Sequence, residues 1–415
     1  MLGRVIDEIA RREGPRILAG LIRRTGGHFD LAEEALQDAF EKALSNWQSE
    51  GIPDRPAAWL TTVARNRLID LLRRAWHAVG DDAFLEQVAA PEAQSHDDGF
   101  PDDRLRLLFT CCHPALAVPA QTALALRTLC GLSTREIARA FLETEAATAQ
   151  RIVRAKKKIA LARIPYEIPP REALPERLAS VLSVIYLVFS EGYAASAGDS
   201  IVRTDLCEEA IGLGRLLASL LPGEPEVLGL TALMLLHDSR REARSDAQGR
   251  IVALEDQDRA QWNRTRIAEG LAMLDKAIAM RRRGSYQVQA AIAALHAKAA
   301  GAADTDWRQI AALYRALLDL LPTPVVELNA AAALAMAEGP SEGLAWIERI
   351  EARDELADYH LLPAAKADLL RRSGRNAEAA VNYRRAIALV SNPAERPFLE
   401  SRLRAMNVPL ECASR

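Results

Sequence analysis

The most informative stretch of this chain, for both fold and function, is residues 131–159, GLSTREIARAFLETEAATAQRIVRAKKKI. Ser133 is a good N-cap for a first short helix, and Glu136 three residues later completes a capping box. Leu142 stands in the following turn, where such turns often carry a glycine. The apolar residues of this helix follow helical spacing: Leu132, Ile137, Ala138 and Phe141. The stretch therefore predicts two short helices joined by a tight turn.

The second helix of this pair is expected to have an apolar side and a cationic side. The apolar stripe consists of Ala149, Ile152, Val153 and Ile159. The opposite side carries Ala147, Gln150, Arg151, Arg154 and Lys158. Residues 121–165 contain nine Lys and Arg against three Glu, a local charge of +6 (9 − 3). Such a helix can pack on a partner and enter a DNA major groove, so the pair is a candidate helix-turn-helix. The alternative is an ordinary helical hairpin with a basic surface.

A second segment suited to nucleic acid lies upstream, at residues 59–74, WLTTVARNRLIDLLRR. Helical register gives it a core-facing stripe of Leu60, Val63, Ala64, Leu68, Leu71 and Leu72. Its other face carries Thr61, Thr62, Arg65, Asn66 and Arg73. Pro56 lies just before it, where the first turn of a helix tolerates proline. We expect an amphipathic helix with a cationic outer face.

An acidic amphipathic helix is predicted further upstream, at residues 30–44, DLAEEALQDAFEKAL, with Asp30 as its N-cap. Its exposed carboxylates would repel DNA and suit a basic protein partner: Glu33, Glu34, Asp38 and Glu41. Residues 45–55, which contain Trp47, Gly51 and Pro53, are expected to form a loop.

The order of these three motifs resembles bacterial RNA polymerase sigma factors of the extracytoplasmic-function (ECF) group. It runs DLAEEALQDAF, then W-L-x-x-V-A-R-N-x-x-x-D-x-L-R-R, then an L-S-x-x-E-I-A helix-turn-helix that closes on R-A-K-K-K. The resemblance covers roughly residues 8–163 and implies two partners, core RNA polymerase and promoter DNA. It also implies that residues 30–44 contact the polymerase clamp, through Asp30, Glu33, Glu34, Gln37, Asp38 and Glu41.

The same resemblance assigns the DNA contacts. Residues 45–55 and the helix from Trp59 would open and read the −10 promoter element, through Trp59, Thr62, Arg65, Asn66, Arg73 and Arg74. The second helix of the helix-turn-helix would read the −35 element, through Ala147, Gln150, Arg151, Arg154, Lys157 and Lys158. Aromatic groups beside cations capture unstacked bases, so Trp59 and Trp47 are candidates for that role. The alternative for each tryptophan is a place in the core.

The composition is typical of an all-α protein with two to four domains in 415 residues. Residues 80–103 contain eight Asp and Glu and no Lys or Arg. This linker either weakens DNA binding until polymerase is engaged or merely keeps the chain soluble. The expected division is 1–76 as sigma region 2, 77–103 as the acidic linker, 104–165 as the region 4 helix-turn-helix, 171–300 as a helical extension domain and 301–415 as TPR-like helical repeats.

The extension begins after the proline-punctuated residues 165–170 and fills over half the chain. The lead-in DDRLRLLFTCCHPAL resembles an ECF subgroup that carries a long C-terminal extension. Residues 178–191 predict a buried helix. YRALLDLLPTP from Tyr314 matches YRRAIALVSNP from Tyr383 at an offset of 69 residues, two periods of TPR spacing. Such repeats present a concave surface to a protein or peptide; the alternative is a plain helical bundle.

No catalytic, cofactor-binding or metal-binding constellation is visible, so we do not expect an enzyme. Cys111, Cys112 and His113 lack a second ligand pair at zinc-site spacing, and buried thiols are the better interpretation. The five Cys, the charged N-terminus and the absence of any ~20-residue apolar run favour a cytoplasmic protein without a membrane span.

We therefore expect a sigma factor whose extension regulates it in cis, either by inhibiting it or by holding its active arrangement. One alternative is a polymerase-independent helix-turn-helix regulator with a TPR sensor module. Another is an interaction scaffold whose N-terminal helices only resemble DNA binders.

Overall fold

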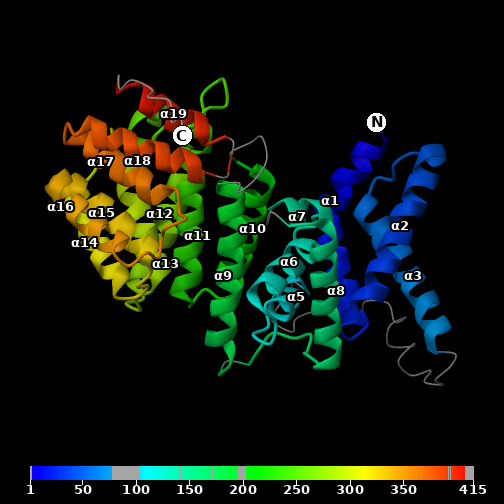
Figure 1. The fold of residues 1–415 in the computed structure, drawn as a ribbon. Coiled ribbons are helices and arrows are strands. Elements are labelled where there is room, and N and C mark those ends of the chain that lie inside the picture. The colour runs from blue at the N-terminus through cyan, green and yellow to red at the C-terminus, as the bar shows by residue number, and fades with distance from the viewer. Residues whose placement is uncertain are drawn as a thin grey trace. The chain divides into compact units, whose positions relative to one another are not determined.

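The computed structural model of the chain describes residues 2–76, 103–140, 143–170, 172–194, 202–390, 392 and 394–406. Within these ranges the chain is helical and forms no β-strand, apart from an isolated antiparallel bridge between Ser245 and Ile251. The expected all-α class is therefore confirmed. The chain divides into two compact units, residues 1–188 and 189–415 (Figure 1). No described helix is long and apolar enough to span a membrane.

The first unit begins with three helices that pack on one another, α1 (Leu2–Arg24), α2 (Phe29–Glu50) and α3 (Pro56–Trp76). The inner stripe expected for α3 is present: Leu60, Ala64, Leu68, Leu71 and Leu72 are buried and Val63 is half-buried. Leu142 lies outside the described residues. So does the predicted linker, apart from its last residue, Asp103, which is the first residue of the next helix.

The bounds of α2 correct two predictions. His28 occupies the N-cap position, so Asp30 lies in the first turn instead. The helix starts early because Phe29 is buried at 3 % exposure. It also runs on to Glu50, so the expected loop at residues 45–55 shrinks to residues 51–55. Its buried face continues at four-residue spacing through Ala43 to Trp47, and the helix ends at a glycine with positive φ, Gly51 (φ +83°).

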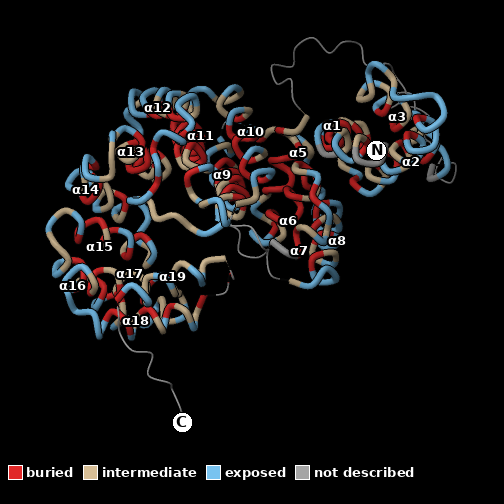
Figure 2. The backbone as a smooth tube through the Cα atoms, turned by 90° about the horizontal axis from the view of Figure 1, so that it is seen from above, coloured by how far each residue is buried: buried red, intermediate tan, exposed pale blue. Residues whose placement is uncertain are grey.

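The rest of the first unit consists of α5 (Asp103–Cys111), α6 (Val118–Thr128), α7 (Thr134–Ala140) and α8 (Glu145–Leu161). The inner residues of α5 and α6 are buried, as the red segments of Figure 2 show. The next helix, α9 (Leu174–Tyr193), crosses the boundary between the units and is strongly apolar, as expected for residues 178–191.

In the second unit most helices pack mainly on their neighbours in sequence. Its elements are α10 (Thr204–Leu220), α11 (Pro225–Asp238), the 3-10 helices η1 (Arg241–Arg244), η2 (Leu254–Asp256) and η3 (Arg259–Gln261), α12 (Arg264–Ala279), α13 (Ser285–Lys298), α14 (Trp307–Leu318), α15 (Pro324–Glu338), α16 (Pro340–Glu351), α17 (Leu361–Arg372), α18 (Asn376–Leu389) and α19 (Arg396–Arg404). A continuous apolar core joins α15 to α19.

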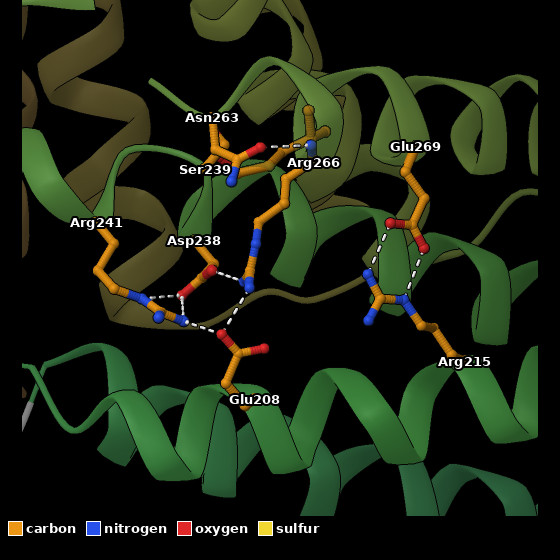
Figure 3. A network of polar contacts seen from close by, with 9 residues as sticks. Glu208, Arg215, Asp238, Ser239, Arg241, Asn263, Arg266 and Glu269 are labelled. Carbon is orange, nitrogen blue, oxygen red and sulfur yellow. Dashed lines mark hydrogen bonds and ion pairs between the residues drawn. The ribbon is translucent and has the colours of Figure 1, made fainter. Parts of the chain in front are cut away.

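A network of ion pairs holds α10, α11 and α12 together (Figure 3). The carboxylate of Asp238, whose side chain is 2 % exposed, accepts from the guanidinium groups of Arg241 and Arg266. Glu208 of α10 accepts from the same two arginines at 3.1 and 2.6 Å. A buried carboxylate is stable only when paired in this way, so the network fixes how these helices meet.

Candidate nucleic-acid interface

The predicted helix-turn-helix corresponds to α7 and α8, and its capping box is confirmed. The backbone N–H of Glu136 donates to the Ser133 hydroxyl at 3.2 Å, while the Ser133 N–H donates to the Glu136 carboxylate at 2.8 Å. The second helix has its own cap, because the Thr144 hydroxyl accepts from the N–H of Ala147 at 3.2 Å. Both helix starts are therefore fixed by local hydrogen bonds.

The buried side of α8 differs from the predicted stripe. Ile152 and Ile159 are buried as predicted, but Val153 is 48 % exposed. The other buried residues of α8 are Thr148 and Ala155. Adjacent helical residues are about 100° apart, so Val153 cannot share the centre of the stripe with Ile152. The outer side presents Ala147, Gln150, Arg154, Lys157 and Lys158 to solvent.

Arg151 is the exception on that outer side. Its guanidinium forms a bidentate pair with the carboxylate of Glu143, with both N–O distances at 2.6 Å. The hydrogen bonds from Arg151 hold the pKa of Glu143 below its usual value. Arg151 is thus half-buried and engaged at the start of α8, whereas Arg154 is exposed and, among the described residues, donates only to the Gln150 side chain, at 3.5 Å.

The basic cluster of α8 contacts the acidic helix α2 within the same unit. The Nζ of Lys156 lies 2.5 Å from Oε2 of Glu33 and 3.3 Å from Oδ1 of Asp30. The side chains of Lys156 and Glu33 are only 11 % and 26 % exposed. The prediction that Glu33 is freely exposed is therefore wrong, because a cation from α8 covers it.

The prediction for Asp38 also needs correction. The Asp38 carboxylate accepts from the Nε of Arg67 on α3, and its side chain is 27 % exposed. Arg67 additionally lies 3.6 Å from Glu34. The predicted polymerase-binding residues that remain exposed are Asp30, Glu34, Gln37 and Glu41, and the side chains of the last two are hydrogen-bonded to each other at 3.1 Å.

A cleft of about 890 Å³ runs beside this acidic face, between α1, α2 and the segment from α6 to α7. Its walls include Glu33, Gln37 and Glu41 on one side and Arg127 and Arg135 on the other. The acidic face of α2 is therefore accessible in part, through a groove that also bears cations.

The two tryptophans of the predicted −10 segment touch each other. Their rings meet edge to face, with centroids 5.4 Å apart and planes at 60°. Trp47 is 4 % exposed and belongs to the core, so it is not available to capture a base. Trp59 is half-buried. It lies on α3 with the other predicted contacts, of which Thr62, Asn66, Arg73 and Arg74 are exposed and Arg65 is half-buried.

The cysteines at positions 111 and 112 are fully buried thiols. Burial raises the pKa of Cys111 to about 12. The hydrogen bond between its thiol and the Thr128 hydroxyl, at 3.4 Å, acts in the opposite direction and lowers this pKa. The Nδ1 of His113 accepts from the backbone N–H of Ala115. In the described ranges no three His, Cys, Asp or Glu side chains are grouped so that they could hold a metal ion.

Comparison with known proteins identifies both halves of this first unit. Residues 9–78 match Sigma-70 region 2, and residues 106–159 match Sigma-70, region 4. A chain in which region 2 is followed by region 4 is a sigma factor of the sigma-70 class. Residues 177–278 match a family of unknown function (DUF6596).

The chain is also 50% identical over 390 residues to the uncharacterized protein R00370 of Rhizobium meliloti (strain 1021), with 92% of each chain covered. It belongs to the same family as that protein. No solved structure matches the chain.

Three contacts that shape this surface were not identified from the sequence: those of Arg67, Glu143 and Lys156. Arg67 is flanked by Ala64 and Leu68 of the buried stripe, so its position beside the α2 contact follows from helical spacing. Glu143 lies eight residues before Arg151 across a turn, where no periodic pattern relates them. The Lys156 contact spans 123 residues of sequence and has no local signal.

Proposed function

We propose that this sigma factor belongs to the ECF group, binds core RNA polymerase through α2, and directs initiation at promoters with −35 and −10 elements. The observation that carries this proposal is the pair of helices α3 and α8. Each helix has a buried apolar side and a cationic outer side. A polymerase-independent regulator needs only one such helix. The working partner of the acidic helix would be the polymerase, so we place the protein in the cytoplasm.

Within this proposal, the exposed residues carry the recognition. Arg154, Lys157 and Lys158 of α8 would enter or flank the −35 major groove, with Ala147 and Gln150 beside them. Thr62, Asn66, Arg73 and Arg74 of α3 would lie along the −10 element, with Trp59 at its start. Glu34, Gln37 and Glu41 of α2 would meet the polymerase clamp.

The contact between Lys156 and Glu33 supports a further step in the proposal. It joins the −35 helix to the polymerase-binding helix, so the same acidic face cannot serve Lys156 and a basic polymerase surface at once. We infer that the free chain is closed at this contact and that polymerase binding opens it. Such competition is a shift between two states, driven by the difference in affinity of polymerase for each.

We also propose that the extension regulates the sigma factor in cis through a TPR-like surface that takes a protein or peptide partner. Consecutive helix packing from α14 to α19 supports it, as does the placement of Tyr314 and Tyr383 against apolar cores in α14 and α18. Removal of residues 189–415 tests this, because it removes the second unit and leaves the first. The truncation keeps the contact in which Arg177 of α9 donates to the carbonyl of Phe109.

The central experiment adds purified protein to core RNA polymerase and maps transcription starts in vitro. Promoter-specific initiation that depends on the protein is expected. Tight, specific binding to duplex DNA without any association with core polymerase would favour the regulator instead. The Glu41→Lys variant, altered at an exposed α2 position, should lose core binding while keeping its fold.

A further inference from the structure

A cavity of about 570 Å³ lies within the second unit, and none of its lining residues is a predicted DNA or polymerase contact. Segment 253–259 and helices α13, α14, α15 and α17 line it. Volumes of 300–1,000 Å³ are typical of small-molecule sites. Most of its wall is apolar, formed by Leu254, Trp307, Ala332, Met336, Ala365 and Leu369.

The carboxylates on this wall already have cationic partners. Glu255 accepts from Arg372 of α17 at 2.7 Å and from Arg402 of α19 at 3.3 Å. Asp368 accepts from Arg372 at 2.7 Å. These pairs tie segment 253–259 to the C-terminal helices and leave no carboxylate of the wall to attract a cationic ligand.

Among the described residues, the buried guanidinium of Arg259, by contrast, donates hydrogen bonds only to neutral oxygens, and it lies over the Trp262 ring, 4.7 Å from the ring centroid. It is 9 % exposed and donates to the carbonyls of His296 and Ala299 and, at 3.5 Å, to the hydroxyl of Thr305. No ion pair joins it to a carboxylate of the described chain. The charge of Asp304 acts on it from outside hydrogen-bonding range, and burial lowers its pKa. A buried cation without a carboxylate in direct contact creates a site that favours an anion.

His296 adds a neutral polar group at the same end of the cavity. Burial, with the charges of Arg240 and Arg259, lowers the pKa of its imidazole to about 4, so the ring is uncharged near neutral pH. The ring meets Trp307 edge to face with centroids 5.2 Å apart. Its buried Nδ1 has no hydrogen-bond partner among the described residues. Arg259, Thr305 and His296 together make one polar end on an otherwise apolar cavity.

We propose that this cavity binds a small organic acid, with an aromatic or aliphatic body against the apolar wall and its carboxylate or equivalent anion at Arg259. The charge balance of the wall selects this class over cations and over uncharged hydrocarbons. The proposal concerns binding by the chain alone, so it stands or falls independently of the activity proposed for the first unit.

The first test compares two probes with the same ring system. 1-Anilinonaphthalene-8-sulfonate carries an anion, whereas N-phenyl-1-naphthylamine does not, and both brighten in apolar sites. The full chain is expected to bind the sulfonate at one site, at least about tenfold more tightly than the amine, which corresponds to about 1.4 kcal/mol. Decanoate should displace it, and decanol should do so at least tenfold less well.

Variants then locate the site. Ala332→Phe and Ala365→Phe place a ring inside the cavity and should abolish binding of the sulfonate. Ala312→Phe adds the same ring at an exposed position of α14 outside the cavity and should leave binding unchanged. Arg259→Lys, which keeps the charge, should retain preference for the anion, and Arg259→Met should lose it. Circular dichroism and a cooperative thermal transition identify the variants that remain folded.

Binding of the sulfonate that survives in both folded cavity-filling variants would overturn the proposal. Equal affinity for the sulfonate and the amine would overturn the assignment of an acid, as would equal displacement by decanoate and decanol. If Arg259→Met does not fold, the comparison of matched probes on the unaltered chain still decides the question.

Discussion

The Nζ of Lys156 on α8 lies 2.5 Å from Oε2 of Glu33 on α2, and the two residues are 123 positions apart in the sequence. The pair is largely shielded from solvent, whereas the second partner of Lys156, Asp30, is 87 % exposed and contributes little. Glu33 is thus the residue that gives the contact its strength. Its other oxygen, Oε1, is buried without a partner among the described residues.

A double-mutant cycle on Lys156→Ala and Glu33→Ala should give a coupling free energy of about 1–3 kcal/mol in urea unfolding. The magnitude follows from a charged hydrogen bond between shielded groups. Lys157→Ala, at the exposed neighbouring position, should show almost no coupling to Glu33→Ala. A coupling near zero for the Lys156 cycle would mean that the contact does not persist in solution.

The same lysine should limit polymerase binding. If Lys156 competes with the polymerase for α2, Lys156→Ala should raise the affinity of the chain for core polymerase severalfold in the absence of DNA. Fluorescence anisotropy with labelled chain measures this directly. Lys158→Ala serves as the control, since it removes an exposed charge from the same helix without touching α2. Weaker core binding by Lys156→Ala would contradict the closed state.

Arg154 should read the −35 element. Arg154→Ala should cost about 1–3 kcal/mol at one base-pair position and relax specificity there. Arg151→Ala should act mainly through the lost pair with Glu143, lowering stability more than specificity. Lys157→Ala should weaken binding to all sequences alike. It should also reduce the slope of log affinity against log salt concentration by the contribution of about one phosphate contact. Binding to a library of −35 variants at several salt concentrations separates these effects; unchanged selectivity in Arg154→Ala would remove its assignment.

The pair between Glu143 and Arg151 should make α8 sensitive to acid. The folded-state pKa of Glu143 is lowered, so its stabilising contribution is present above the usual unfolded-state value of about 4.3 and is lost as pH falls through the lowered pKa. Glu143→Gln should therefore lower the hydrogen-exchange protection of α8 by about 1 kcal/mol at pH 7 and much less near pH 3. Glu145→Gln, at an exposed position, should have less than half this effect at pH 7. Equal effects at both pH values would contradict the role of the charge.

Two glycines in helices should respond oppositely to alanine. A Cβ on Gly343 of α16 would lie 2.5 Å from the Ala335 Cβ and 2.8 Å from the Ala331 carbonyl oxygen, whereas one on Gly212 of α10 would meet open space. Gly212→Ala should stabilise the chain by about 1 kcal/mol through helix propensity. Gly343→Ala should instead destabilise it by about 1–3 kcal/mol because α15 and α16 must separate. Thermal unfolding of both variants measures the contrast; a stabilised Gly343→Ala would show that this crossing is loose.

Local patterns were enough to predict much of the site. The capping box of Ser133 and Glu136 and the buried stripe of α3 are short-range features, and both are confirmed. The placement of Val153 was wrong because apolar character alone does not tell which of two neighbouring residues faces inward. Trp47 looked like a loop residue because Gly51 and Pro53 follow it, yet the four-residue spacing from Ala43 keeps it helical and buried.

Long-range pairing could not be predicted from these patterns. Glu33 and Asp38 belong to an acidic run that any solvated helix could display, and only the fold brings Lys156 and Arg67 to them. The cavity of the second unit is a still clearer case. Arg259, His296 and Arg372 occur in separate segments without a shared motif, so their meeting depends on how five elements pack.

The ion pairs of Glu255 also determine when the cavity can form during synthesis of the chain. Its partners Arg372 and Arg402 follow it by 117 and 147 residues, so the wall that they hold cannot close until the last helices have left the ribosome. At translation rates of about 5–20 residues per second, that delay is roughly 7–30 s after Glu255 is made. The nascent chain therefore exposes both sigma regions before the cavity exists. Any control exercised through a bound acid begins only after α19 has been made.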